Sequence, residues 1–169
     1  MVLEDYLSSV YIIAATLILY GIAFLVIESR KKQPTMDSLE ALTYQAAFFI
    51  GCFQVLAAIP GTSRSGATIL GAVILGCSRY VASEFSFFLA IPVMAGASGL
   101  KLLKYFLKTG MFSGEEWILL LIGTFVSFVV SIFAIRMLLG YIRKHDFKIF
   151  GVYRIILGMI VILYFAFLG

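Results

Sequence analysis

The chain consists of long apolar segments separated by short polar stretches. Four segments, at about 6–27, 83–100, 115–139 and 150–167, are nearly free of charge and roughly 20 residues long. An α-helix of that length crosses the hydrocarbon core of a bilayer once. The pattern therefore predicts an all-α membrane protein with about four transmembrane helices. It excludes a porin-like barrel, whose strands read as short alternating segments.

A further apolar region is interrupted in its middle. An apolar piece at 43–58 leads into the polar stretch 59–68, and a second apolar piece follows at 67–77. Neither piece is long enough to span the bilayer alone. We therefore expect a re-entrant helix-loop-helix hairpin, a backbone that membranes tolerate where protein or water surrounds the loop. Its first helix is expected to start near Leu39, capped by Asp37 or Ser38.

Composition and charge agree with this fold class. Hydrophobic residues make up 62% of the 169 residues and charged residues 13%, and the mean hydropathy is +1.06. A water-facing surface cannot be built from this composition, so we expect one membrane domain over 1–169. The net charge of +4 comes from bases that flank the spans, which favours lipid headgroups over nucleic acid as partners. Cys52 and Cys77 are expected to be small buried hydrophobes.

The basic residues also predict an orientation. If the hairpin enters and leaves on the cytoplasmic side, eight basic residues fall inside and three outside, as the positive-inside rule requires. The eight are Arg30, Lys31, Lys32, Arg79, Arg136, Arg143, Lys144 and Lys148, and the three are Lys101, Lys104 and Lys108. The hairpin apex then points from the cytoplasmic side toward the membrane interior.

The interrupting stretch collects hydrogen-bond donors and contains no carboxylate. Arg64 presents a planar fork that can hold two phosphate oxygens. Gly61 and Gly66 lack a Cβ, so the backbone can approach a ligand closely. The hydroxyls that can donate to the remaining oxygens belong to Thr62, Ser63, Ser65 and Thr68. Ser65 is suited to cap a helix that resumes at Ala67, which would aim free N–H groups at the same guest. The guest is expected to be an anion.

A structural interpretation stays open beside this one. The stretch could be a helix break whose hydroxyls satisfy the backbone, with Arg64 paired to a carboxylate elsewhere. Other polar residues in the spans are interpreted as structural. Glu84 is expected to pair with Arg79, Arg154 to reach the interface or find a partner, and His145 to lie on the surface.

The polar stretch and its flanks resemble a known family. Residues 60–68 are similar to the Pro-Gly-x-Ser-Arg-Ser-Gly-x-Thr signature of the undecaprenyl-pyrophosphate phosphatases, the bacitracin-resistance membrane phosphatases. The block at 44–54, which ends at Gln54, and the block at 78–92, which contains Arg79 and Glu84, are also similar to that family. The resemblance covers essentially the whole chain.

The resemblance implies an enzyme of the bacterial inner membrane that removes one phosphate from undecaprenyl pyrophosphate. This reaction recycles the lipid carrier of cell-wall synthesis, and family members work with a divalent cation, Mg or Ca. By position in the signature, Arg64 binds the pyrophosphate, and Ser63 and Thr68 contact it or assist the chemistry. The remaining members of the substrate-binding loop are Gly61, Thr62, Ser65 and Gly66. Gln54, Arg79 and Glu84 are secondary candidates.

The chain departs from the family pattern in one large respect. Family members resemble two inverted halves, and the first half supplies a Glu-x-x-x-Glu motif and a Ser-Ser-Thr-Gly-His block, neither of which occurs here. The chain therefore looks like the C-terminal part, with no metal ligands identified and no base for Ser63. A missing N-terminal half or a homo-oligomer would complete it. A polyprenyl-phosphate transporter or flippase and an inactive fragment are the alternatives.

Overall fold

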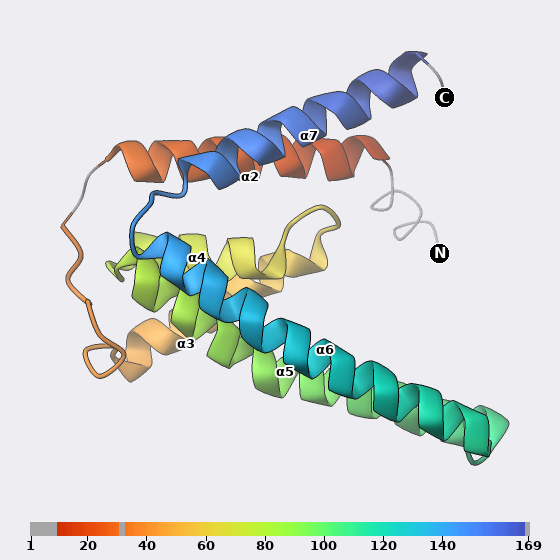
Figure 1. The fold of residues 1–169 in the computed structure, drawn as a ribbon. Helices are drawn as coiled ribbons and strands as arrows, with labels where there is room; N and C mark the ends of the chain where they lie inside the picture. The colour runs from red at the N-terminus through yellow and green to blue at the C-terminus, as the bar shows by residue number, and fades with distance from the viewer. Residues whose placement is uncertain (1–9, 31–32, 168–169) are drawn as a thin grey trace.

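The computed structural model describes residues 10–30 and 33–167, and helices form the regular structure of these residues (Figure 1). The helices are α2 (Val10–Ser29), α3 (Tyr44–Gln54), the 3-10 helix η1 (Val55–Ala58), α4 (Arg64–Ile74), α5 (Arg79–Thr109), α6 (Gly114–Ile142) and α7 (Lys148–Phe167). Among them, α2, α5, α6 and α7 are long and apolar enough to cross a membrane. The predicted all-α fold with four spans is therefore confirmed.

Helices α2 and α7 form an antiparallel pair that packs through glycine (Figure 1). A Cβ on Gly21 of α2 would lie 2.7 Å from the backbone oxygen of Gly151 on α7. Near the other end of the pair, a Cβ on Gly158 would lie 3.0 Å from the backbone oxygen of Ala14. Small residues at these positions let the two backbones approach closely, which is the main source of helix association in lipid.

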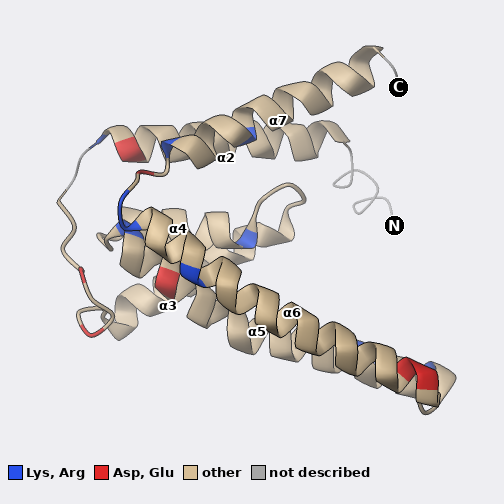
Figure 2. Cartoon of the chain, in the orientation of Figure 1, with Lys and Arg blue, Asp and Glu red and all other residues tan. Residues whose placement is uncertain are grey.

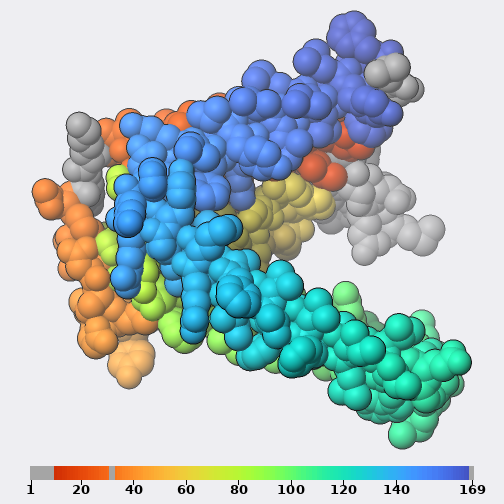
Figure 3. Space-filling model, viewed as in Figure 1, coloured from red at the N-terminus to blue at the C-terminus, as the bar shows by residue number. Residues whose placement is uncertain are grey.

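Helices α5 and α6 form a long arm that extends away from the α2–α7 pair (Figures 1 and 3). Both helices run further than the hydrophobic pattern predicted, because their ends are set by caps and not by apolar length. Helix α5 continues through Pro92 until Gly110, whose φ of 89° ends it. Ser113 and Glu116 then form a capping box that starts α6.

The two helices of the hairpin begin at other residues than predicted. Helix α3 does not start near Leu39, because residues 38–42 form turns and Thr43 is the cap, its Oγ1 accepting from the Ala46 N–H at 3.1 Å. Helix α4 starts at Arg64, and its cap is Ser63 in place of the predicted Ser65. Gly61 makes the tight turn early, so the helix can resume three residues sooner than expected.

The two cysteines differ in exposure. Cys77 is buried as predicted, in the turn between α4 and α5, and burial raises the pKa of its thiol. Cys52 is exposed, and the prediction of burial was wrong for it. Helix α3 buries Ala46 and Ile50, which are four residues apart on one face. Cys52 follows Ile50 by two positions and so lies off that face.

An ion pair joins three elements at one end of the structure. Glu28 of α2 is buried and accepts from the guanidinium of Arg79 at the start of α5. Its other oxygen accepts from the backbone N–H of Phe147, just before α7, at 3.3 Å. The predicted pair between Arg79 and Glu84 was wrong, and Glu84 instead accepts from the Tyr80 hydroxyl at 3.3 Å. Five positions along a helix separate two side chains by about 140°, so Arg79 and Glu84 face different neighbours.

We expect Glu28→Ala to lower the free energy of unfolding by about 1–3 kcal/mol, since it strands the Phe147 N–H and removes the partner of Arg79. Most of this loss comes from the unpaired Phe147 N–H, because water reaches half of the Arg79 side chain and screens its ion pair with Glu28. Thermal unfolding in mild detergent measures the change. Asp37→Asn removes an exposed carboxylate and is the control, expected to stay within about 0.5 kcal/mol of wild type. Equal stability of the two variants would contradict the role assigned to Glu28.

Candidate anion site at the hairpin apex

The apex of the hairpin rests against the middle of a transmembrane helix. The Thr16 hydroxyl of α2 lies 2.9 Å from the backbone oxygen of Pro60 and can donate to it. Gly61 has a φ of 84°, and a Cβ on it would lie 2.7 Å from the Ile13 backbone oxygen. Thr16 precedes the C-terminal residue of α2, Ser29, by thirteen positions, or about 20 Å along the helix. The apex of the hairpin thus lies about 20 Å along α2 from Ser29, on a helix long and apolar enough to cross a membrane.

The hydroxyls of the loop have different environments. Ser63 accepts from the Gly66 N–H at 3.2 Å, and its oxygen lies 3.1 Å from the Ser65 hydroxyl. Both serines are only partly buried, so they can turn toward a guest. Thr68 is fully buried, and its hydroxyl lies 2.6 Å from that of Ser86 on α5. It also lies 3.1 Å from the backbone oxygen of Arg64. This geometry gives Thr68 the role of fixing α4 against α5.

Unpaired buried polar atoms concentrate at this apex. Within the described residues, four buried side-chain nitrogen or oxygen atoms have no hydrogen-bond partner. They are Gln54 Oε1, Thr62 Oγ1, Arg64 Nη1 and Arg154 Nη1. Three belong to the hairpin, and the fourth belongs to a side chain that contacts it. Each such group costs free energy that a polar guest would recover, so the distribution indicates a binding site.

Arg154 of α7 is the functional candidate that sequence reasoning missed. Its guanidinium lies against Gly66, where a Cβ would be 2.8 Å from Nη2. It also lies 5.5 Å from the centre of the Phe24 ring. A cavity of about 150 Å³ is lined by Arg154 together with Ser65, Gly66 and Ser83. Its one sequence signal was an arginine inside an apolar span, which does not by itself show whether the side chain points inward.

The first turn of α4 is bordered by two arginines on different faces. Arg64 begins the helix, and Arg154 lies against Gly66, two positions or about 200° further around it. Within the described residues, no carboxylate lies within ion-pair distance of either arginine, and the pairs found there are Arg79–Glu28 and Lys148–Asp146. The alternative interpretation, in which Arg64 pairs with a carboxylate, is not supported by these residues. Two arginines that find no carboxylate among residues 10–30 and 33–167 favour a guest that carries several negative charges.

The secondary candidates divide between the apex and the other end of the structure. Gln54 ends α3 and leaves its amide oxygen unpaired, so it belongs to the apex. Arg79 does not, because it pairs with Glu28, which lies twelve positions or about 18 Å from Thr16 along α2. Glu84 is committed to Tyr80 on its own helix. Arg79 and Glu84 therefore lie apart from the apex, and a functional role for them stays a prediction.

The described residues do not fit a divalent cation. Over residues 10–30 and 33–167, no group of three His, Cys, Asp or Glu side chains is close enough to hold a metal ion. The apex offers guanidinium groups, which repel a cation, and hydroxyls, which are weak ligands. We therefore assign no ligand for Mg or Ca to this chain and derive no chemical step through such an ion.

The chain matches a family model described as "Bacitracin resistance protein BacA" over residues 1–160. The chain belongs to this family. Relatives named undecaprenyl-diphosphatase in Latilactobacillus sakei, Acetivibrio thermocellus and Enterococcus faecalis are 54%, 60% and 55% identical to it. The matches cover 95%, 90% and 97% of this chain but 59%, 56% and 62% of the relatives. The chain thus spans about 60% of the length of the relatives it matches.

Family membership agrees with the sequence resemblance and gives the apex its context. The three relatives carry the name of an enzyme that acts on a diphosphate. A diphosphate is a multiply charged anion with two phosphoryl groups, each of which can accept from a guanidinium. The assignment of this chain to the C-terminal part of the family stays a prediction.

The docking of the apex can be tested at Gly61. We expect Gly61→Ala to destabilise the protein by at least about 2 kcal/mol, because an L-residue is strained at this φ and the new methyl group collides with α2. Thermal unfolding in detergent measures this. Gly99→Ala is the matched control, since a Cβ there meets nothing within 4 Å. It is expected to be neutral or stabilising by up to about 1 kcal/mol. A Gly61→Ala variant as stable as Gly99→Ala would refute the docked apex.

Proposed function

We propose that this chain supplies the pyrophosphate-binding part of an undecaprenyl-diphosphatase in the bacterial inner membrane. The reaction is the hydrolysis of undecaprenyl pyrophosphate to undecaprenyl phosphate and inorganic phosphate, which recycles the carrier lipid of cell-wall synthesis. The observation that carries the proposal is the buried Nη1 atom of Arg64, unpaired at a hairpin apex deep in the membrane. The names of the relatives support the choice of substrate.

The two arginines divide the diphosphate between them in this proposal. Arg64 holds oxygens of one phosphoryl group through its planar fork, and Arg154 holds oxygens of the other from the opposite helix. The N–H groups in the first turn of α4 add the positive end of a helix dipole. The Gly66 N–H is already donated to Ser63, which keeps that turn in shape. The polyprenyl chain extends from the site into the surrounding bilayer.

The same groups favour the transition state of hydrolysis. When the bond between phosphorus and the bridging oxygen breaks, negative charge grows on the leaving phosphate. Fixed guanidinium groups in a site with little water stabilise this charge without reorganising. Gln54 offers an acceptor that can orient an attacking water molecule. Thr68 positions Arg64 through its bond to Ser86 and is not required to touch substrate.

The groups that activate the nucleophile lie outside the described residues in this proposal. Ser63 and Ser65 bond to each other, and among the described residues neither forms a hydrogen bond with a carboxylate or imidazole that could act as a base. The acid–base groups and the ligands of any divalent cation come from the remainder of the protein or from a second copy. This chain contributes binding and charge stabilisation.

The proposal is tested at Arg64 in the full-length gene product. Phosphate release from a polyprenyl pyrophosphate in detergent micelles is expected to fall by about 100-fold or more in Arg64→Lys, because lysine keeps the charge but loses the fork. Arg154→Lys is expected to lower kcat/KM by about 10-fold or more, since Arg154 covers only part of the guest. Lys104→Gln removes an exposed cation on α5 and is the control, with activity near wild type.

Two outcomes would overturn the proposal. Turnover near wild type in Arg64→Lys would reduce Arg64 to a structural counter-charge. A wild-type protein that moves a polyprenyl phosphate between leaflets of a vesicle but releases no phosphate would be a transporter. Melting temperatures close to wild type in both arginine variants ensure that a loss of activity reports on the site.

A further inference from the structure

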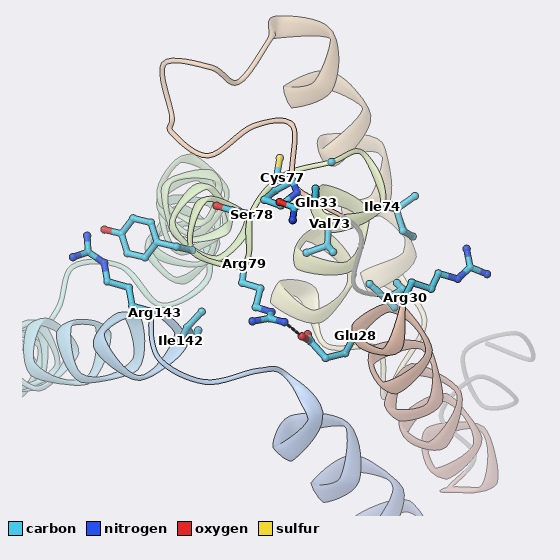
Figure 4. A pocket seen from close by; sticks show the side chains of 14 residues that line it. Glu28, Arg30, Gln33, Val73, Ile74, Cys77, Ser78, Arg79, Ile142 and Arg143 are labelled. Atoms are coloured by element: carbon cyan, nitrogen blue, oxygen red, sulfur yellow. Dashed lines mark hydrogen bonds and ion pairs between the residues drawn. The ribbon is translucent and has the colours of Figure 1, made fainter.

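A second polar cavity lies at the opposite end of the hairpin from the apex (Figure 4). Its volume is about 680 Å³, and its walls come from the C-terminal ends of α2, α4 and α6 and the first turn of α5. Along α4, the nearest residue that lines it, Val73, is nine positions or about 14 Å from Arg64. The cavity is therefore distinct from the proposed diphosphate site, and nothing assigned to that site uses it.

The lining of this cavity is positively charged. Arg30, Arg79 and Arg143 line it together with one carboxylate, Glu28. Glu28 is only 5% exposed and already accepts from Arg79 and from the Phe147 N–H, so it is not free to neutralise the others. Figure 4 shows Arg79 extending toward Glu28, whereas the Arg30 and Arg143 side chains lie on opposite sides with their guanidinium groups turned outward. The Arg143 guanidinium lies 4.2 Å from the centre of the Tyr80 ring. The Arg79 side chain is 48% exposed, so part of its guanidinium remains open to a guest.

The first turn of α5 adds backbone donors to the same cavity. Ser78 caps this helix, and the side chain of Ser78 accepts from the Val81 N–H at 3.3 Å. Ser78, Arg79 and Tyr80 all line the cavity, so the N-terminal turn of α5 borders it. The first N–H groups of a helix lack acceptors within that helix, and they favour a phosphate or carboxylate oxygen.

The remaining walls are apolar, which narrows the class of guest. Ile27, Val73, Ile74 and Ile142 line the cavity beside the arginines. A guest that satisfies both sets has a phosphate group attached to an apolar body. The cavity lies where three transmembrane or re-entrant helices end, which is the depth of lipid headgroups. The basic flanks predict that this end is cytoplasmic, and the cytoplasmic leaflet carries anionic lipids.

We propose that this cavity binds the phosphate group of an anionic phospholipid of the cytoplasmic leaflet. The phosphate lies on the open part of Arg79 at the first turn of α5, and the exposed Arg30 and Arg143 side chains turn inward to it from either side, Arg143 leaving the Tyr80 ring. The glycerol and the start of the acyl chains lie on the isoleucine and valine side chains. A volume of about 680 Å³ is sufficient for one headgroup. In this position the lipid contacts the ends of α2, α5 and α6 on the surface of the protein. Glu28 connects α2, α5 and the segment before α7 in the interior.

Native mass spectrometry of the detergent-solubilised protein, titrated with phosphatidylglycerol or phosphatidylcholine, tests the proposal. Wild type is expected to bind phosphatidylglycerol more tightly than phosphatidylcholine. Arg30→Gln/Arg143→Gln leaves the Glu28–Arg79 pair intact and is expected to weaken phosphatidylglycerol binding by about tenfold or more, while phosphatidylcholine binding changes little. The matched control is Lys101→Gln/Lys104→Gln, which removes two charges from the distant part of α5 and is expected to bind as wild type does.

Three results would overturn the proposal. The first is phosphatidylglycerol binding in the arginine variant that equals wild type. The second is an equal loss in the lysine control, which would indicate net charge and not a site. The third is displacement of the lipid by inorganic phosphate alone at the same concentration, which would make the cavity a site for a soluble anion. Thermal unfolding of the variants verifies that both arginine changes leave the fold intact.

Discussion

The contact between the Pro60–Gly61 turn and α2 determines where the polar groups of the hairpin lie. A turn in hydrocarbon must have its backbone groups satisfied by protein, and the Thr16 hydroxyl does this for Pro60. Gly61 allows the close approach because its positive φ and missing Cβ let the loop lie flat on the helix. Ser63 then starts α4 at once, which places Arg64 at its first residue and Thr68 one turn later.

The arginines at the two ends of the hairpin differ in whether a carboxylate lies beside them. At the end away from the apex, Arg79 is paired with a buried carboxylate that also accepts from a backbone N–H, so this ion pair fastens helices together. At the apex, Arg64 and Arg154 keep buried nitrogen atoms that find no partner among the described residues. A buried charge without a partner lowers stability, so stability alone does not explain these arginines. Arrangements of this kind are retained where a ligand provides the missing charge. Figure 2 shows that the helices carry few charged residues between their ends, so a single charge there has a large influence on the local electrostatics.

Much of this arrangement could be predicted from the order of residues, and the failures have physical causes. The four spans and the broken pair follow from apolar length, because a bilayer fixes how many residues a crossing helix needs. The caps at Thr43 and Ser63 were missed because several serine and threonine residues lie close by in the sequence. The backbone angles decide which of them caps the helix. The contacts of Arg79 with Glu28 and of Arg154 with Gly66 were missed because each joins helices that are far apart in the chain. Local spacing cannot identify such contacts.

Helix α2 contacts the hairpin through Thr16 and packs on α7 at Gly151 and Gly158, which lie on either side of Arg154 along α7. Both the apex and α7, which carry Arg64 and Arg154, are therefore positioned by contacts with the same helix, α2. If α2 tilts in a thicker or thinner bilayer, the apex and α7 tilt with it, and the gap between the cations keeps its width. A slip of α7 by one turn, in contrast, would carry Arg154 about 5.4 Å past Gly66. Gly151 and Gly158 fit closely against the α2 backbone and its side chains only in the present register, so such a slip would lose these contacts.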